Sequence, residues 1–430
     1  MAKKKVLILG AGLAGLSAAW HLQKKGLNCL VFEKEREVGG LCRSKEIDGF
    51  TFDYDGHLLH FKHIQAFNLV RELLKDNLAR HQRNAWVYAH KCYIPYPFQA
   101  NLHGLPSAVV KECLLGLMSA SHNGKLEKSK NFLEWMNCAF GKGIARHFMI
   151  PYNSKFWTLP PQEMNCEWLD GFVPVPSFSQ IIEGTIGESH QKLGYNVNFW
   201  YPKKGGIQQL SLAFAARLKN IFTNSAVTEI DLIKKEITVA SRERIKYDYL
   251  IYTLPLPEIT HLMKGIPEKI RVLSNKLRWN SILNVNLGIE IKDTHLRHWV
   301  YFPQKSVCFF RVGFYHNFSK DATPTDANAL YVEVSYSKNK PIDKNNIVHR
   351  VKDDLKKVGI LQGLDSVRTV DINDIKYGYP IYDGHYNSVR YSIIKYLSRQ
   401  GIIPCGRYGS WRYFSMENAI LDGKRAASLV

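Results

Sequence analysis

Hydrophobic residues in the first part of the chain form short blocks that predict a strand, a helix and a second strand. Residues 6–9 are a continuous apolar run, as in a parallel strand covered on both faces. A helical pattern follows to about Lys25, where Gly26 ends it, and a second apolar run at 29–32 leads to Glu33. The pattern predicts a βαβ unit of about 30 residues, and not a secretory signal, because the first apolar run ends in glycines at a strand's length.

The rest of the chain divides by its periodicity. Residues 49–55 alternate as a strand does, 93–199 are rich in helical segments, and 282–391 are rich in strands. Two further strands are predicted at 223–230 and 250–255. A helix is predicted to run to about Leu429, with Ser415 as its N-cap and Glu417 in its first turn. No stretch approaches the ~20 apolar residues of a membrane-spanning helix.

Composition indicates a globular protein of two or three domains. The 430 residues are 45% hydrophobic, which excludes global disorder. Lys and Arg number 58 against 38 Asp and Glu, a net charge of +20, but they are spread along the chain without the signature of a nucleic-acid module. We therefore expect no nucleic-acid partner. Anionic small molecules and an anionic membrane surface stay open as the charge's targets.

The cysteines and histidines do not predict a metal site. The eight cysteines are scattered and contain no C-x-x-C pair. Reduced thiols in a cytoplasmic protein are the expectation, and no metal is predicted.

The βαβ unit carries the glycine pattern of a dinucleotide site. Gly10 makes the tight turn, Gly12 lets a pyrophosphate approach the backbone, and Gly15 lets the helix pack close to the sheet. The helix N-terminus faces the phosphates, and Glu33 can accept from ribose hydroxyls. The predicted contacts are Gly10, Gly12, Leu13, Ala14, Gly15, Glu33 and Lys34.

A second pair of glycines, Gly39-Gly40, follows the acidic strand end, with Leu41 and Arg43 beside it. This arrangement resembles flavoproteins of the glutathione-reductase-like type, in which the turn extends the dinucleotide site toward the flavin. The resemblance implies non-covalently bound FAD as the resident cofactor, with NAD(P)H open as a reductant.

Further motifs follow in order along nearly the whole chain. They are a Gly56-His57 turn, the segment Tyr152-Asn153-Ser154-Lys155-Phe156-Trp157, Phe309-Phe310-Arg311, tyrosine segments at Tyr336 and Tyr379, and residues 405–420. Together they resemble the UDP-galactopyranose mutase family. The first and last motifs are also typical of the wider superfamily that includes protoporphyrinogen oxidase and monoamine oxidase.

The resemblance implies an α/β fold with a Rossmann-like FAD-binding domain, an inserted helical domain and an antiparallel sheet substrate domain. The FAD-binding domain is expected to comprise 1–90, 201–281 and 393–430. The helical domain is expected at 91–200 and the sheet domain at 282–392.

The resemblance also implies roles for residues of these motifs. The implied catalytic residues are His57, Arg311, Tyr336 and Tyr379. The last three are also implied to bind the substrate, Arg311 at its diphosphate, together with Tyr152, Phe156 and Trp157. Further cofactor contacts are implied at Gly56, His57, Val227, Gly406, Arg407, Ser415 and Met416.

In the resembled family the reduced flavin attacks the anomeric carbon of a sugar through N5, the nucleotide diphosphate leaves, and the ring opens and recloses. The implied function is therefore an FAD-dependent sugar-nucleotide mutase of surface-polysaccharide synthesis. A nucleotide-diphosphate sugar or another anionic small molecule is the implied partner. The implied location is the cytoplasm, with peripheral association at the inner membrane face left open, as is the oligomeric state.

Two alternatives stay open. One is an FAD-dependent amine oxidase-like or protoporphyrinogen oxidase-like oxidoreductase or desaturase, and the other is a flavin-binding protein without catalysis. A departure from the family concerns the substrate: residues 169–175 lack the arginine that clamps the diphosphate, and Asp170 places a negative charge there. Since a neutral side chain does not replace a bidentate arginine, UDP-galactose is not fixed as the substrate.

Overall fold

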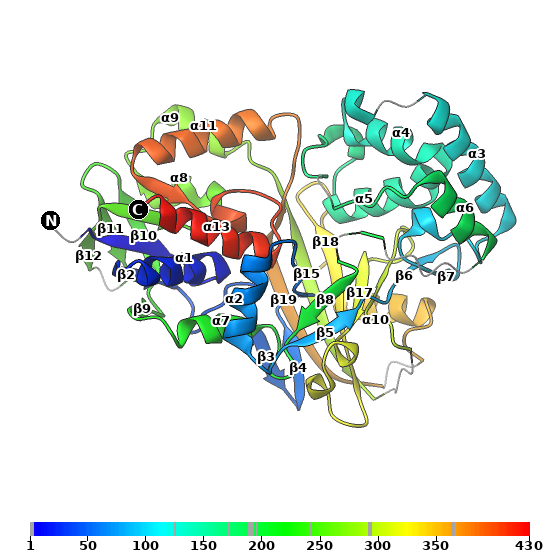
Figure 1. The fold of residues 1–430 in the computed structure, drawn as a ribbon, viewed down its shortest axis with the longest axis horizontal. Coiled ribbons are helices and arrows are strands. Elements are labelled where there is room, and N and C mark those ends of the chain that lie inside the picture. Colours follow the sequence, from blue (N-terminus) through cyan, green and yellow to red (C-terminus); the bar gives the residue numbers. More distant parts are fainter. Residues whose placement is uncertain are drawn as a thin grey trace.

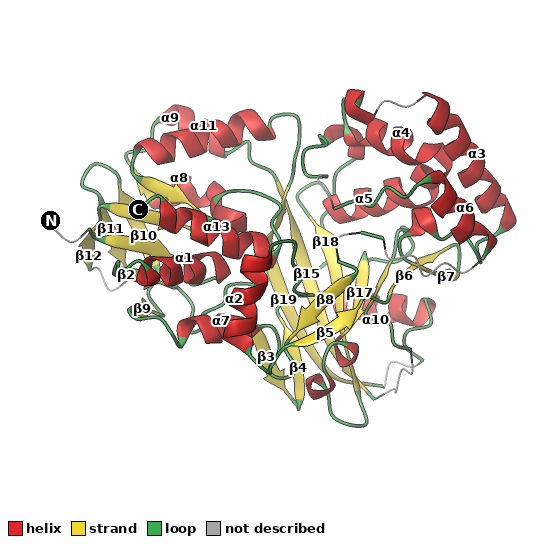
Figure 2. Ribbon diagram, in the orientation of Figure 1, coloured by secondary structure: helices red, strands yellow, loops and turns green. Residues whose placement is uncertain are grey.

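The computed structural model describes residues 4–123, 126–169, 172–187, 193–194, 196–240, 243–290, 295–362 and 366–430. The chain forms a mixed α/β structure with three parts: the lobe that is expected to bind FAD, called the flavin lobe below, a central large sheet and a helical cap (Figures 1 and 2). The predicted fold class is confirmed. None of the helices in the described ranges combines the length and apolar character that crossing a bilayer requires.

A parallel sheet forms the centre of the flavin lobe, and the predicted βαβ unit lies within it. Its strand order is β20-β13-β1-β2-β9. The strands are β1 (Val6–Leu9), β2 (Cys29–Phe32), β9 (Ile221–Phe222), β13 (Tyr249–Tyr252) and β20 (Ile402–Pro404). Helix α1 (Leu13–Lys24) connects β1 to β2 and packs against α13 (Met416–Ser428), as Figure 1 shows.

The remaining elements of the flavin lobe surround this sheet. A small sheet has the order β12-β11-β10-β14. Its strands are β10 (Val227–Asp231), β11 (Glu236–Val239), β12 (Arg244–Lys246) and β14 (Met263–Lys264). The helices are α2 (Ile64–Leu74), α7 (Gln208–Ala215), α8 (Ile259–Leu262), α9 (Glu268–Ser274), α11 (Tyr386–Arg399) and α12 (Gly406–Gly409).

The large sheet has the order β19-β15-β18-β17-β16-β6-β7 and is antiparallel except where β16 pairs with β6. Its strands are β6 (Ala85–Ala89), β7 (Cys92–Pro95), β15 (Trp279–Ile289), β16 (Trp299–Tyr301), β17 (Arg311–Phe314), β18 (Asn328–Tyr336) and β19 (Val367–Pro380). The boundary expected at residue 90 falls inside the β6–β7 hairpin of this sheet.

The two faces of the large sheet differ in chemistry. One face packs an apolar cluster that includes Val332 and Val334 under α10 (Ile347–Lys357). The other is polar and meets the flavin lobe, where Asn286 Nδ2 donates to the carbonyl of Asp53 at 3.0 Å and Lys45 Nζ contacts Asp371 at 2.8 Å. Two antiparallel pairs lie at this junction: the hairpin of β3 (Ser44–Ile47) with β4 (Phe50–Asp53), and the pair of β5 (Ala79–Gln82) with β8 (Asn198–Tyr201), which are far apart in sequence.

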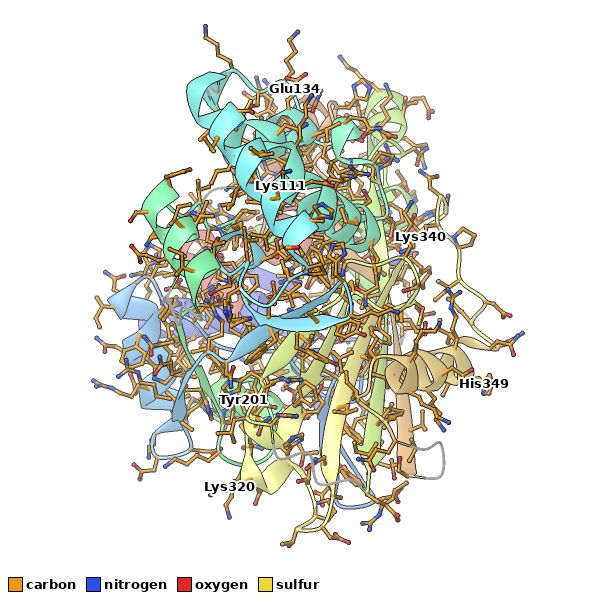
Figure 3. All side chains as sticks on the ribbon, turned by 90° about the vertical axis from the view of Figure 1, so that its right-hand side faces the viewer. Lys111, Glu134, Tyr201, Lys320, Lys340 and His349 are labelled. Atoms are coloured by element: carbon orange, nitrogen blue, oxygen red, sulfur yellow. The ribbon has the colours of Figure 1, made fainter. Side chains whose placement is uncertain are left out.

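The helical cap covers one end of the large sheet. Its helices are α3 (Ser107–Asn123), α4 (Phe132–Ile144), α5 (Ile150–Trp157) and α6 (Phe178–Ile186), and a π-helical turn at Ala145–Met149 joins α4 to α5. Helices α3 and α4 approach so closely that a Cβ atom on Gly143 would collide with the backbone of Glu112, so the contact requires glycine. The side view in Figure 3 places this cap, with Lys111 and Glu134, above the strands.

Candidate active site

The first turn of the flavin lobe has the geometry of a dinucleotide site. Gly10 adopts a φ of +96°, which favours glycine, and its amide donates to the carbonyl of Phe32 at 2.8 Å. A Cβ atom on Gly15 would collide with the carbonyl oxygen of Gly10, so glycine is required for α1 to pack against this turn. Both roles are those that the glycine pattern predicts.

The N-terminus of α1 is open to an anionic ligand. Gly12 is its N-cap, and no side chain caps the first amides. Gly12 also bridges to Gly39, and a Cβ atom on Gly40 would approach Gly12 Cα at 3.3 Å. The backbones of the two glycine turns therefore form one cradle that extends from Leu13 and Ala14 to the half-buried Leu41. This cradle fits the diphosphate of a dinucleotide.

Glu33 lies buried at the end of β2. One carboxylate oxygen accepts from the Ala11 amide at 2.8 Å, and the other accepts from the Glu35 amide at 3.0 Å. Because a carboxylate has about four acceptor positions, lone pairs remain for ribose hydroxyls. Lys34 is exposed and lies 3.5 Å from Glu35, so it does not point into this site.

Two other predicted cofactor contacts border this region. The Ser225 amide donates to the carbonyl of Glu33 at 2.7 Å, which places the segment leading to Val227 beside the acidic strand end. Arg43 Nε donates to the carbonyl of Gly40 at 2.8 Å, and its guanidinium lies over the ring of Tyr54. The second glycine turn is thereby fixed in place.

The C-terminal segment places a cation opposite the first turn. Gly406 adopts a φ of +78°, and Arg407 Nε donates to the carbonyl of Phe414 at 2.9 Å. The Arg407 guanidinium lies 5.0 Å from the centre of the Tyr379 ring. Among the described residues no carboxylate lies within ion-pair distance of Arg407, so its charge is available to a ligand.

Helix α13 begins as the sequence predicts, but its first turn is already engaged. Ser415 caps it in a capping box with Asn418, and Met416 is half-buried. Buried Glu417 accepts from the amides of Lys62 and His63. This carboxylate and the capping box lower the capacity of the helix end to attract a flavin's negative charge.

His57 lies in the turn expected beside the flavin. Its Nδ1 donates to the carbonyl of Asp55 at 2.9 Å, which leaves Nε2 as an acceptor. Burial, followed by the nearby charges of Arg407 and Arg311, lowers the pKa of His57 to about 4. His57 is therefore neutral at pH 7. The preceding Gly56 packs against the ring of Tyr331, where a Cβ atom would collide.

Arg311 lies in the same region but is paired with an acid. Its Nε and Nη2 contact the two oxygens of fully buried Glu333, the latter at 2.7 Å. Asp55 lies close to this pair, and burial together with the Glu333 charge holds the pKa of Asp55 well above its usual range. Three donors of Arg311 remain, but its charge is compensated.

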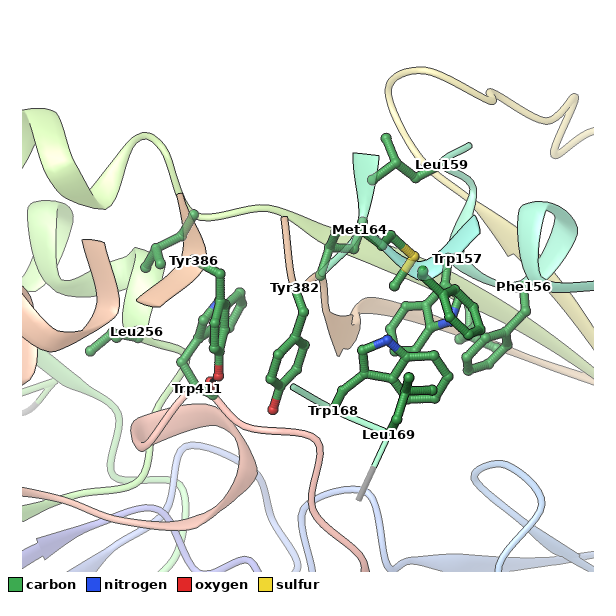
Figure 4. Packing of buried hydrophobic residues seen from close by; sticks show 14 of the residues in the cluster. Phe156, Trp157, Leu159, Met164, Trp168, Leu169, Leu256, Tyr382, Tyr386 and Trp411 are labelled. Atoms are coloured by element: carbon green, nitrogen blue, oxygen red, sulfur yellow. Dashed lines mark hydrogen bonds between the residues drawn. The ribbon is translucent and has the colours of Figure 1, made fainter. Parts of the chain in front are cut away.

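Aromatic side chains surround these charges. Phe156 lies 5.0 Å from Tyr379 and 4.7 Å from fully buried Trp157, and Tyr379 stacks on Tyr413 at 5.3 Å. Figure 4 shows Phe156, Trp157 and Trp168 packed together. The hydroxyls of Tyr152, Tyr379 and Tyr413 have no hydrogen-bond partner within the described parts of the chain, and all three side chains are half-buried.

Tyr336 lies outside this cluster, contrary to the role expected for it. It pairs with Ser281, which lies on the same face of β15 as Leu283 and Val285 of the apolar cluster under α10. Its hydroxyl contacts Asp374. Tyr379 pairs with Asn280, which faces the polar side. Since adjacent strand residues point to opposite faces, Tyr336 points away from Arg311 and Tyr379.

The structure adds residues that the sequence did not single out. Asp55 and Glu333 surround Arg311, and Tyr413 completes the aromatic cluster. Lys155, within the matched motif, is buried, and its three N–H donors are shared among four carbonyl oxygens, those of Phe302, Gln304, Val307 and Phe309, at 2.8, 2.5, 3.1 and 3.0 Å. It holds the 302–309 segment and does not point into the cluster.

Two expectations concern absences. Asp170, within the stretch that lacks the expected arginine, lies outside the described residues. Among the residues that are described, no three His, Cys, Asp or Glu side chains lie together as a metal ion would require.

Comparison with known proteins places the chain in a family. The family model described as flavin containing amine oxidoreductase matches residues 13–430, so the chain belongs to this family. Protoporphyrinogen oxidase 2 of Arabidopsis thaliana is 23% identical over 494 residues, which cover 99% of this chain and 94% of that protein. The protein is thus an FAD-dependent enzyme of the amine oxidase superfamily, and its cofactor is non-covalently bound FAD.

Solved structures agree with this placement. The crystal structure of reduced UDP-galactopyranose mutase has a TM-score of 0.94 and 29% identity, with 99% of this chain and 95% of that chain covered. A fatty acid isomerase from P. acnes has a TM-score of 0.68 and 15% identity, with 100% and 99% covered, and this likeness is one of fold. The predicted resemblance to a UDP-galactopyranose mutase-like flavoprotein is confirmed.

Proposed function

We propose that this enzyme is a mutase that interconverts the pyranose and furanose rings of a nucleotide-linked sugar in surface-polysaccharide synthesis. The observation that carries the proposal is the pair of unpartnered hydroxyls of Tyr379 and Tyr413 beside the uncompensated charge of Arg407. Such a site suits a ligand rich in hydroxyls and negative charge, and it repels an amine cation. The TM-score of 0.94 to reduced UDP-galactopyranose mutase, with 29% identity over 99% of this chain, supports the same choice.

FAD, when bound and reduced, supplies the nucleophilic chemistry of the reaction. The residues of the chain bind and orient the cofactor and the substrate. Arg407 stabilises negative charge at the boundary between the two glycine turns and the aromatic cluster. Tyr379 and Tyr413 donate to sugar or phosphate oxygens, and Tyr152 and Phe156 provide stacking surfaces for a base or a sugar face.

Neutral His57 and paired Arg311 have narrower roles in this proposal. His57 offers Nε2 as an acceptor beside the flavin and adds no charge. Arg311 donates its remaining N–H groups to the substrate diphosphate, while Glu333 fixes the guanidinium in place. Arg311 thus orients the diphosphate more than it neutralises it.

A second candidate is an FAD-dependent oxidoreductase of the protoporphyrinogen oxidase type. The Arg311–Glu333 pair favours it, because a site with a compensated arginine holds a diphosphate less strongly. The Arabidopsis relative, matched over 99% of this chain, is named as such an oxidase.

Product analysis separates the two candidates. Dithionite-reduced protein is incubated without oxygen with UDP-, dTDP- and GDP-linked hexoses, and the products are resolved by chromatography and mass spectrometry. A product of unchanged mass and new retention time is expected. Failure to isomerise any of them, with oxygen consumed during oxidation of a porphyrinogen or an amine, would establish the oxidoreductase instead.

Two tyrosine variants test the site within the same assay. Tyr379→Phe removes a hydroxyl from the aromatic cluster, and we expect kcat/KM to fall about tenfold. Tyr336→Phe removes a hydroxyl on the opposite face of the sheet and should change kcat/KM by less than about twofold. Equal losses in both variants would contradict the assignment of Tyr379.

A further inference from the structure

A cavity in the flavin lobe, separate from the glycine turns and the aromatic cluster, contains two arginines that form no ion pair with a described carboxylate. It has a volume of about 420 Å³ and is bordered by α11, β20 and α13. Arg390, Arg412 and Arg425 line it, and Asp422 is the one acidic residue among its lining side chains. No residue of the two glycine turns or of the aromatic cluster lines this cavity.

Asp422 is fully engaged by other donors. Its Oδ1 accepts from Arg425 Nε at 2.5 Å, and its Oδ2 accepts from the Gly406 amide at 2.7 Å and from Ser410 Oγ at 2.8 Å. Asp422 therefore balances Arg425 and fixes the turn that begins at Gly406. Among the described residues Asp422 forms an ion pair with Arg425 and with neither of the other two arginines.

Arg390 and Arg412 carry two uncompensated charges into the cavity. Within the described residues neither has a carboxylate within the 4.0 Å of an ion pair. Arg390 Nε donates to the carbonyl of Ser410 at 2.6 Å, which leaves its terminal amino groups for a ligand. Burial and the charge of Arg412 lower the pKa of Arg390, as expected for two cations that share a partly enclosed space.

The remaining walls suit a phosphorylated organic molecule. Ile394, Ile402 and Leu429 provide apolar surface opposite the guanidinium groups. The volume lies in the range of small-molecule sites, which is roughly 300–1,000 Å³. Two guanidinium groups with free donors match the oxygens of a phosphate.

We propose that this cavity binds a phosphate group between Arg390 and Arg412, carried by a phosphorylated small molecule or by a lipid headgroup. The site lies behind the segment that carries Arg407, because the Arg412 amide donates to the Arg407 carbonyl at 2.9 Å. A bound phosphate thus contacts the segment that carries Arg407. The proposal does not depend on which reaction the enzyme catalyses.

Calorimetric titration of the FAD-loaded protein with inorganic phosphate at constant ionic strength tests the site. Arg412→Gln is the main variant, because Arg412 is exposed and its replacement does not disturb the core. Arg390→Gln is the second variant. Arg399→Gln is the matched control, since Arg399 is an exposed residue of α11 that does not line the cavity.

We expect saturable binding that weakens at least about tenfold in Arg412→Gln and Arg390→Gln and stays within about twofold in Arg399→Gln. No saturable binding to the wild type, or equal affinities in all three variants, would overturn the proposal. Flotation with phosphatidylcholine vesicles, with and without phosphatidate, identifies the source. Phosphatidate-dependent flotation that Arg412→Gln abolishes indicates a lipid headgroup, whereas phosphate binding without flotation indicates a soluble ligand.

Discussion

Glu333 lies directly opposite Arg311 in the β17–β18 ladder, and its carboxylate contacts the guanidinium through both oxygens. Glu333 has no exposed surface, and Asp55 lies beside it. Arg311 thus lies beside two acids, and burial together with the Glu333 charge raises the pKa of Asp55. Arg311 is therefore fixed in position before any ligand binds.

Removal of Arg311 should leave Glu333 buried without its cation. We expect Arg311→Met to lower the free energy of unfolding by about 3–5 kcal/mol near neutral pH, measured with urea.

The double variant Arg311→Met with Glu333→Gln is the control for this prediction, because it removes the unpaired charge. It should recover most of the lost stability. If Arg311→Met unfolds at the wild-type urea concentration, the pair does not stabilise the sheet.

Lys155 should be important for stability. Lys155→Met leaves four carbonyls of the 302–309 segment without their donor, and we expect a loss of about 3 kcal/mol or more in urea unfolding. Lys111→Met changes an exposed lysine of the helical cap and should lose less than about 0.5 kcal/mol. Similar losses in the two variants would show that the hydrogen bonds of Lys155 are not important.

A methyl group at Gly15 should disturb both the fold and cofactor retention. Gly15→Ala forces α1 away from the carbonyl of Gly10, and we expect a loss of about 1–3 kcal/mol together with reduced FAD content after purification. Gly187→Ala is the matched control, because a Cβ atom there meets nothing within 4 Å. Full FAD occupancy in Gly15→Ala would contradict the account of the first turn.

Local signals explain what could be predicted from the sequence. The glycines of the first turn, the acid at the end of β2 and the Ser415 cap depend on neighbours within a few residues, and each lies where the pattern placed it. The pairing of Arg311 with Glu333 depends on the register between two strands, which a single sequence does not encode locally.

The orientation of Tyr336 could not be predicted for a related reason. Residues Asn328–Ser335 of β18 are buried on both faces, so no alternation of apolar and polar residues shows which face meets the flavin lobe. The neighbouring residue, Ser335, is the one that points toward Phe156, whose carbonyl its Oγ contacts at 2.5 Å. Because adjacent residues of a strand point to opposite faces, Ser335 faces the aromatic cluster, and Tyr336, the residue expected there, does not.

Acid should destabilise the protein partly through His298. Its Nδ1 accepts from the Asn84 amide at 3.0 Å, and burial, followed by the charge of His81, lowers its pKa to about 3. The folded-state pKa is depressed, so the stabilising contribution is present above the unfolded pKa of about 6.5 and is lost as the pH falls. Between about pH 6.5 and pH 5 this loss amounts to about 2 kcal/mol.

His298→Asn keeps an acceptor but does not titrate, so it should reduce the slope of unfolding free energy against pH in that range. His349→Asn makes the same change at an exposed histidine of α10, labelled in Figure 3, and is the matched substitution outside the core. Identical slopes in the wild type and His298→Asn would show that His298 titrates alike in the folded and unfolded chains.

The proposed redox-neutral chemistry is tested most directly by counting electrons. Reduced enzyme is supplied with excess nucleotide sugar without oxygen, while the flavin absorbance and the amount of product are followed together. A mutase forms many products per flavin, and the flavin stays reduced throughout. Product limited to one per flavin, or formed only when oxygen is admitted and consumed in proportion, would contradict the mutase account and identify an oxidase.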